Sequence, residues 1–405
     1  MAKRILIFTN HFFPENFKVN EIADVLVEEG NIVHVVTGIP NYPTGNFYPG
    51  FGFFSKSFER KNENFTIRRL PLVPRGSGSK PRLIINYISY MVSVWIYTIY
   101  LVLFKEKFDL IFVHHTSPIF ITIPPVFYRW VRKSKNILWD LDMWPDTLNA
   151  LGIINSKRIT SLLERVMKWI YQRYDHVLLG SKSFLVRAKN RIEEQKFSYF
   201  PNWAEKIFTD SQYSIPPIEP EFPIGLKIMY AGNIGVAQDF ENVVKAIQLL
   251  KNEQIHWLIV GDGRNREWFQ SQIEDLGLND KVIFYGNQNL EHMPYYFSKA
   301  DVMFLSIKNE KIFQMTVPAK LQAYMGFGKP ILGMISGEGA QIIQEANGGF
   351  VVESGDSNAL AQKIRIFLDL ELSEREKMGN RNKAYYETNF SLEARKDQLR
   401  KLIYN

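Results

Sequence analysis

Short apolar runs alternate with segments of helical periodicity through the second half of the chain. Each run ends in glycine or in polar residues. After the run at 227–231, the apolar residues between 240 and 250 recur at the three- and four-residue spacing of a helix that packs on one face. Buried strands that alternate with helices predict an α/β fold with a parallel sheet. The apolar runs lie at 227–231, 255–263, 281–289, 300–306, 317–334 and 346–352.

The first of these runs leads into a glycine turn with the sequence GNIG, at 232–235. Such a turn between a buried strand and a helix lets backbone N–H groups approach a phosphate, and the helix dipole favours the anion. An ordinary strand–helix turn without a ligand explains the same residues. The glycines that end the later runs favour a ligand, because open α/β sheets bind ligands at the carboxyl edge of their strands.

A change in composition divides the chain. Residues 211–225 contain four prolines and a glycine, which is typical of a linker. We therefore place a domain boundary within 203–224. Strands and helices alternate on both sides of it, so a chain of 405 residues has room for two α/β domains.

Residues 83–104 form an uncharged apolar segment with basic residues on both sides. Its length permits a membrane span. A span would separate the strand that follows from the first strands of the domain. Two other interpretations stay open, a core helix of the first domain and a helix lying partly in the bilayer interface with help from its basic flanks.

Composition and charge narrow the function. The chain has no cysteine, which excludes disulfides and thiolate chemistry and fits a reducing compartment. The net charge of +7 is uneven: residues 1–200 hold 27 Lys and Arg against 16 Asp and Glu. A basic half suits a membrane surface or a lipid pyrophosphate, and no nucleic-acid motif accompanies it.

Longer strings resemble one family. In the second half the order is GNIG, GDG, YGN, PAK and GKP, and this order resembles the retaining nucleotide-sugar glycosyltransferases of the GT-B fold, glycosyltransferase family 4. The first half resembles the capsule and O-antigen branch of that family, and the bacterial L-fucosamine transferase-like subgroup in particular. The strings that carry this second resemblance are residues 5–45 with the loop GIPNYPTG, FDLIFVHHTSPIF at 108–120, WDLDMWPDT at 139–147 and YFPNWAE at 199–205.

The resemblance implies an α/β GT-B fold, with two Rossmann-like domains whose parallel sheets face each other across a cleft. It implies an acceptor domain at 1–203, a linker at 204–224, a nucleotide-sugar domain at 225–372, and helices at 373–405 that return to the first domain. The implied reaction is retaining and needs no metal or other cofactor. It moves a sugar from a UDP-sugar to a polyprenyl-pyrophosphate-linked glycan in capsule or O-antigen biosynthesis, in the cytoplasm at the inner face of the plasma membrane.

Lys320 is the candidate cation for the leaving diphosphate, because it stands in the first turn of a helix predicted to begin near Pro318. A lysine there is unfavourable for the helix dipole, which suggests another use. The family's usual arginine and lysine are replaced here by Asn233 and Gln238, and its pair of glutamates by Met315 and Ala323. The expected donor-binding residues are Gly232, Asn233, Gly235, Asp262, Gly286, Asn287, Lys320 and Glu338.

In the first domain, the resemblance places His114 at the transferred sugar. Asp140 and Asp142 are expected on one face of a strand, and Asp142 is the candidate for the acceptor's proton. A metal site is the competing interpretation of these carboxylates, and the pattern lacks a histidine or a calcium loop. The predicted acceptor-binding residues are Asn16, Lys18 and Asn20.

Two alternatives remain at this point. A nucleotide-sugar 2-epimerase uses the same kind of scaffold, although it needs a site rich in acid–base groups and has no reason for an uncharged 22-residue segment. A catalytically inactive, membrane-associated partner of another transferase would explain the replaced arginine, lysine and glutamates.

Overall fold

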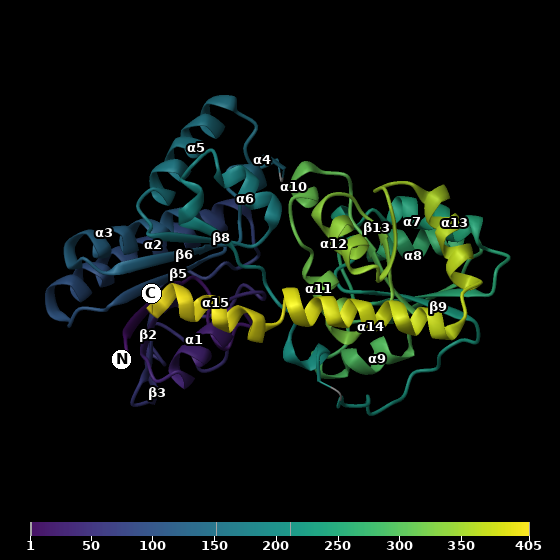
Figure 1. The fold of residues 1–405 in the computed structure, drawn as a ribbon, viewed down its shortest axis with the longest axis horizontal. Helices are drawn as coiled ribbons and strands as arrows, with labels where there is room; N and C mark the ends of the chain where they lie inside the picture. Colours follow the sequence, from purple (N-terminus) through teal and green to yellow (C-terminus); the bar gives the residue numbers. More distant parts are fainter. Residues whose placement is uncertain (1, 151, 211, 405) are drawn as a thin grey trace. The chain divides into compact units, whose positions relative to one another are not determined.

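The computed structural model describes residues 2–150, 152–210 and 212–404, which pack as two units (Figure 1). The first unit comprises the chain up to residue 200 together with residues 403 and 404, and the second comprises residues 201–402. Each unit has its own predominantly parallel sheet covered by helices, so the predicted α/β architecture with two Rossmann-like domains is confirmed.

The sheet of the first unit has the strand order β3-β4-β2-β1-β5-β6-β7-β8. All neighbouring strands are parallel except β3, which pairs with β4 in antiparallel orientation. The order reverses between β1 and β5, which makes this pair the topological switch point of the sheet. The strands are β1 Arg4–Thr9, β2 Ile32–Gly38, β3 Phe58–Asn62, β4 Phe65–Leu70, β5 Leu110–His115, β6 Lys135–Asp140, β7 His176–Leu179 and β8 Phe197–Tyr199.

Six α-helices belong to the first unit among its described residues. The longest is α2, Lys80–Phe104, which connects β4 to β5 and packs on α3 and β4. The others are α1 Val19–Glu28, α3 Ile123–Arg132, α4 Asp146–Ala150, α5 Lys157–Tyr171 and α6 Lys182–Ala188.

Helix α2 buries one face and exposes the other. The buried residues recur every three or four positions, and they include Asn86, Tyr90 and Thr98. Between them lies a stripe of large apolar side chains that are 45–65% exposed along the length of the helix. The helix is long and apolar enough to cross a membrane. Its buried face packs on α3 and β4, as expected of a helix that connects two strands of the sheet. We define the exposed stripe as Ile84, Ile85, Ile88, Val92, Ile96, Ile99 and Leu103.

The sheet of the second unit is fully parallel, with the strand order β11-β10-β9-β12-β13-β14. This order reverses between β9 and β12. The predicted apolar runs form these strands, although several runs extend beyond the strand into the loop that follows. The strands are β9 Leu226–Ala231, β10 Ile255–Val260, β11 Val282–Gly286, β12 Val302–Ser306, β13 Ile331–Met334 and β14 Gly349–Val352.

The core of the second unit explains its helical periodicity. Helix α7, Phe240–Leu249, buries Phe240, Val243 and Ile247 against Ile228 and Trp257 of the sheet. The apolar spacing in the sequence therefore marks the face of the helix that packs on the strands. The remaining helices are α8 Arg266–Asp275, α9 Met293–Lys299, α10 Lys311–Gln314, α11 Ala319–Phe327, α12 Glu338–Ala346, α13 Ser357–Leu368, α14 Leu372–Asn389 and α15 Leu392–Tyr404.

The carboxyl-terminal helices differ from the expectation that residues 373–405 return to the first domain. Helix α14 packs on α11 and α12 within the second unit. Tyr386 of α14 holds the start of that unit, because its hydroxyl accepts a hydrogen bond of 3.2 Å from the backbone N–H of Ala204. Only the last residues of α15 belong with the first unit, where the Tyr404 hydroxyl accepts from the side-chain amide of Asn31 at 2.7 Å.

Candidate functional site

The sheet of the second unit opens at its switch point. Strands β9 and β12 pair only through Ile228–Val302 and Met229–Met303, so the last residues of β9 have no strand partner on that side. Tyr324 of helix α11 fills the gap. Its hydroxyl lies 3.1 Å from both the backbone N–H and the carbonyl of Ala231, accepting from the first and donating to the second. The side chain of one helix thus completes the hydrogen bonding of the strand that ends at the glycine turn.

Lys320 lies one helical turn before Tyr324, in the first turn of α11, as predicted. Its ammonium donates a hydrogen bond to the Tyr230 hydroxyl and lies 3.9 Å from the centroid of the same ring. Burial lowers the pKa of Lys320 from 10.5 to about 7. Within the described part of the chain no carboxylate forms an ion pair with it. An anion that binds beside Lys320 at the carboxyl edge would therefore stabilise its charged form.

Two glycines in the adjoining loops are required by close approach. A Cβ atom at Gly232 would lie 2.5 Å from Cε of Lys320, and one at Gly261 would lie 2.1 Å from the carbonyl oxygen of Gly232. Both have φ near +130°. The loops after β9 and β10 can stack on each other, and Lys320 can reach the first of them, only because these side chains are absent.

Of the other donor residues predicted near the first turn, one is exposed and two make hydrogen bonds within their own loops. Asn233 is exposed, and Gly235 donates its N–H to the side chain of Gln238 at 3.0 Å. Asp262 accepts from the N–H of Gly263 at 2.8 Å and lies 3.6 Å from Arg266, so its carboxylate also serves its own loop.

The remaining donor candidates lie on other elements of the same unit. Gly286 has φ of +68° at the end of β11, and Asn287 after it is exposed. Glu338 is buried as the first residue of α12. Gly286 and Asn287 follow β11 at the carboxyl edge, and Glu338 follows β13 there. Their role in binding stays a prediction.

In the first unit, His114 lies at the corresponding switch point, opposite Thr9 where β1 and β5 pair. Its Nδ1 is 2.9 Å from the Thr9 hydroxyl, and that hydroxyl donates its proton to the carbonyl of His11 at 2.9 Å. Nδ1 of His114 is therefore the protonated nitrogen, and the buried Nε2 is a hydrogen-bond acceptor with no partner among the described residues. Burial, with a smaller contribution from the neighbouring histidines, lowers the pKa of His114 to about 3, which keeps the ring neutral.

His115 and Asp140 form a buried structural network. Nδ1 of His115 lies 2.8 Å from Asp140, whose other carboxylate oxygen accepts from the Tyr171 hydroxyl. Burial alone would raise the pKa of Asp140, but the charge of His115 and the hydrogen bonds from His115 and Tyr171 lower it. These partners occupy the Asp140 carboxylate.

Asp142 does not share a strand face with Asp140, so that expectation is wrong. Strand β6 ends at Asp140, and the Asp140 carboxylate accepts the N–H of Asp142 at 3.0 Å, which turns the chain. Asp142 is half-buried and accepts from the hydroxyl of Ser117, which in turn accepts from the Trp144 indole at 2.8 Å. Asp142 and His114 come from neighbouring strand ends of the same sheet.

Two of the three predicted acceptor residues make contacts within the turn after β1. Asn20 accepts from the N–H of Phe13 at 3.1 Å and donates to the carbonyl of Glu15 at 2.8 Å. Lys18 pairs with Glu21 at 3.1 Å. Asn16 is exposed. The amide of Asn20 is thus occupied in shaping the turn after β1.

A buried chain of polar groups beside this turn escaped the sequence analysis. Glu15 accepts from Nδ1 of His11 at 2.7 Å, and Nε2 of His11 accepts from the Arg75 guanidinium at 3.1 Å. The other Glu15 oxygen accepts from the N–H groups of Asn41 and Tyr42, both at 2.7 Å. The cluster joins the loop after β1, the loop after β2 and the segment before α2.

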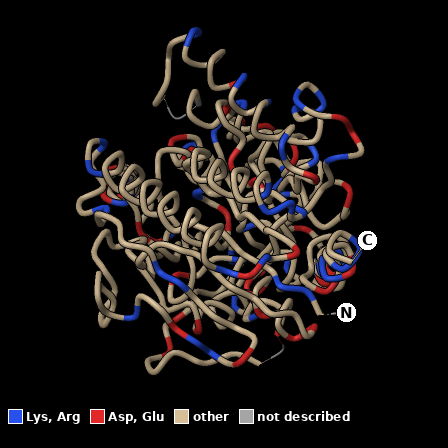
Figure 2. Tube along the Cα trace, turned by 90° about the vertical axis from the view of Figure 1, so that its left-hand side faces the viewer, with Lys and Arg blue, Asp and Glu red and all other residues tan. Residues whose placement is uncertain are grey.

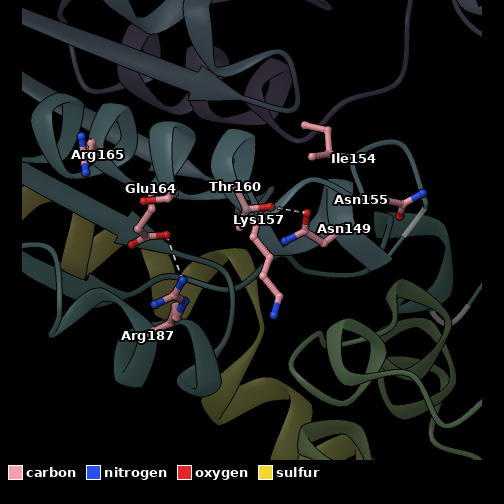
Figure 3. Close-up of a pocket in the computed structure, with 9 residues that line it drawn as sticks. Asn149, Ile154, Asn155, Lys157, Thr160, Glu164, Arg165 and Arg187 are labelled. Atoms are coloured by element: carbon pink, nitrogen blue, oxygen red, sulfur yellow. Dashed lines mark hydrogen bonds and ion pairs between the residues drawn. The ribbon is translucent and has the colours of Figure 1, made fainter.

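The first unit also has an open surface pocket of about 630 Å³ between α4, α5 and α6 (Figure 3). Glu164 and Arg187 pair across it at 2.8 Å, and Thr160 donates to Asn149 at 3.0 Å. None of the residues predicted from the sequence is among those described as lining it. Separately, the described residues contain no group of three or more His, Asp or Glu placed to hold a metal ion.

Comparison with known proteins finds one family model that matches part of the second unit. Residues 218–385 match the model of the glycosyl transferases group 1 family. A probable glycosyltransferase, WbjE of Pseudomonas aeruginosa, is 25% identical over 73% of this chain and 75% of its own. The putative colanic acid biosynthesis glycosyl transferase WcaI of Escherichia coli K12 is 23% identical over 80% of this chain and 81% of its own.

Solved structures share the fold. Sucrose-phosphate synthase from Thermosynechococcus elongatus superposes with a TM-score of 0.72 and 16% identity, over 100% of this chain and 98% of its own. HepE of Anabaena, solved in complex with UDP, has a TM-score of 0.65 and 12% identity, over 99% of both chains. At these identities the likeness concerns the GT-B fold alone.

Proposed function

We propose that this enzyme, whose residues 218–385 match the glycosyl transferases group 1 model, transfers a sugar from a UDP-sugar to a polyprenyl-pyrophosphate-linked glycan with retention of anomeric configuration. The reaction requires no metal in this proposal. The product would serve capsule or O-antigen biosynthesis at the inner face of the plasma membrane. The colanic acid function in the name of WcaI and the UDP in the HepE structure support the substrate class.

The observation that carries the proposal is the Lys320 ammonium at the carboxyl edge of the second sheet. It lies at the glycine turn after β9, without a carboxylate partner in the described residues. Sugar transfer from a nucleotide requires the charge of the departing diphosphate to be stabilised, and a preorganised cation in a partly dehydrated site does this effectively. In this proposal Lys320 takes the role of the family's usual arginine and lysine, whose positions hold Asn233 and Gln238 in this chain.

The first unit supplies the groups that meet the sugar. Nε2 of His114 accepts a hydrogen bond from a sugar hydroxyl, because the Thr9 contact fixes the proton on Nδ1. In a retaining reaction on one face of the sugar, the departing phosphate itself takes the acceptor's proton. Asp142 then assists through charge rather than as the principal base.

Helix α2 holds the enzyme at the membrane without crossing it. Its exposed stripe is apolar, and Arg82 and Lys105 lie at its two ends. Basic and acidic positions along the trace are marked in Figure 2. An apolar helical face with basic flanks favours an anionic bilayer surface. The packing of the opposite face on α3 and β4 favours an interfacial position over a span.

The test is incubation of the purified protein with candidate UDP-sugars, with and without a lipid pyrophosphate-linked acceptor. The proposal is supported if UDP is released only when the acceptor is present and if the new glycosidic bond has the same anomeric configuration as the donor sugar. A nucleotide sugar inverted at C2 would indicate the epimerase, and neither product across the panel would indicate an inactive partner. A thermal-shift screen over nucleotide sugars chooses the donor first, because a ligand that binds only the folded state raises the melting temperature.

A further inference from the structure

Arg75 holds an unusual position in the first unit. Its guanidinium carbon lies 5.2 Å from the ring centroid of Tyr42 and 5.5 Å from that of Tyr87, so two aromatic rings flank it. Its guanidinium donates a hydrogen bond to Nε2 of His11 at 3.1 Å. No carboxylate pairs with Arg75 in the part of the chain that the structure describes, and its Nε is buried without a partner there.

The contacts of His11 fix the direction of this guanidinium. Glu15 is 2% exposed and accepts from Nδ1 of His11, which places the lone pair of Nε2 toward Arg75. Phe17 stacks on the imidazole with ring centroids 4.6 Å apart. Glu15 and His11 therefore orient the partly exposed arginine, and among the described residues no carboxylate contacts its guanidinium directly. The N–H donors that His11 does not use can meet an anion.

The segment that carries Arg75 is fastened to the amino-terminal part of α2. Asn86 donates to the carbonyl of Val73 at 2.6 Å, and Ser89 accepts the N–H of Val73 at 2.9 Å. Ile84, Ile85 and Ile88 begin the exposed stripe within this same stretch of helix. Arg75, through its contact with the Tyr87 ring at 5.5 Å, and the start of the exposed stripe are thus both carried by the same turns of α2.

We propose that Arg75 binds the pyrophosphate of an isoprenoid-linked acceptor, with Glu15 and His11 as positioning residues and the start of the exposed stripe beside the isoprenoid chain. This inference deepens the proposed function and rests on it for the nature of the acceptor. A guanidinium binds phosphate oxygens through paired N–H donors, and it can do so here without leaving His11. Asn16, Lys18 and Asn20 then have a smaller part in acceptor binding than the sequence suggested.

The test measures binding of farnesyl pyrophosphate to the full chain in the presence of saturating UDP, which keeps the probe out of the donor site. Farnesol is the uncharged control ligand. Arg75→Gln should weaken farnesyl pyrophosphate binding by about tenfold or more, and Arg75→Lys by less, because a point charge replaces the paired donors. His11→Phe should fall between wild type and Arg75→Gln. Arg60→Gln, which changes an exposed arginine on β3, should bind as wild type does.

Binding of UDP should be unchanged in all these variants, which separates acceptor recognition from loss of folding. Equal affinity of Arg75→Gln and wild type for farnesyl pyrophosphate would overturn the inference, as would no binding by wild type. If the wild type transfers sugar and Arg75→Gln keeps the acceptor KM, the inference fails and the proposed function stands. If no transfer occurs but binding depends on Arg75, the proposed function fails and the pyrophosphate site stands.

Discussion

Replacement of Lys320 by methionine tests the donor site most directly. Methionine keeps much of the length and packing of the side chain next to Gly232 and removes the charge. A charge-assisted hydrogen bond to an anion contributes about 1.5–3 kcal/mol. We therefore expect the Kd for UDP to rise about 10- to 150-fold in Lys320→Met.

The pKa of about 7 for Lys320 leads to a second prediction, which concerns the pH dependence of UDP binding. Without ligand, Lys320 loses its proton as the pH rises through about 7, and the diphosphate must then restore it. UDP affinity should therefore be highest below pH 7 and fall above it, by at most about tenfold per pH unit. UDP titrates as well, so the informative quantity is the difference between the wild-type and Lys320→Met profiles.

Isothermal titration of UDP between about pH 6 and 9 measures both effects. Lys251→Met is the matched control, because Lys251 is exposed and precedes β10 at the opposite edge of the sheet. An unchanged Kd in Lys320→Met, or pH profiles that run parallel in the two proteins, would refute the assignment of Lys320 to the diphosphate.

Three further predictions concern the first unit. His114→Ala should lower turnover at saturating donor by about 10²–10⁴-fold, and Asp142→Asn by less, with folding checked by circular dichroism; a near wild-type rate for His114→Ala would make the histidine structural. Ile88→Asp with Ile96→Asp should abolish binding to anionic vesicles, as high salt should for the wild type, whereas Ile218→Asp, an exposed position in the linker, should not; retention of wild type through carbonate extraction would favour a span. Because the pKa of His114 is held near 3 in the folded protein, stability should be lost as the pH falls from about 6.5, and the melting temperature of His114→Gln should fall less over that range.

The strands and their ligand edge were readable from the sequence, since apolar runs that end in glycine have few alternative folds. The same holds for Lys320, because Pro318 predicted where α11 begins. The prediction for Asp142 was wrong because it extended the strand past Asp140. No local sequence pattern indicates that the Asp140 carboxylate accepts the N–H of the residue two positions later.

The Arg75 cluster was missed for a different reason. His11 and Glu15 are close in sequence, but Arg75 joins them only through the sheet, 64 residues away from His11. In the sequence it was one of several arginines near an apolar segment. A buried charge network of this kind is defined by tertiary distances, and local periodicity carries no signal for it.

The gap between β9 and β12 has a consequence for how this site can be observed. The amide proton of Ala231 is protected by the Tyr324 hydroxyl of a helix and not by a neighbouring strand. Its exchange with solvent deuterium therefore reports the undocking of α11, the same helix that carries Lys320. A single amide signal can follow the opening of the site in solution, independently of substrate and turnover.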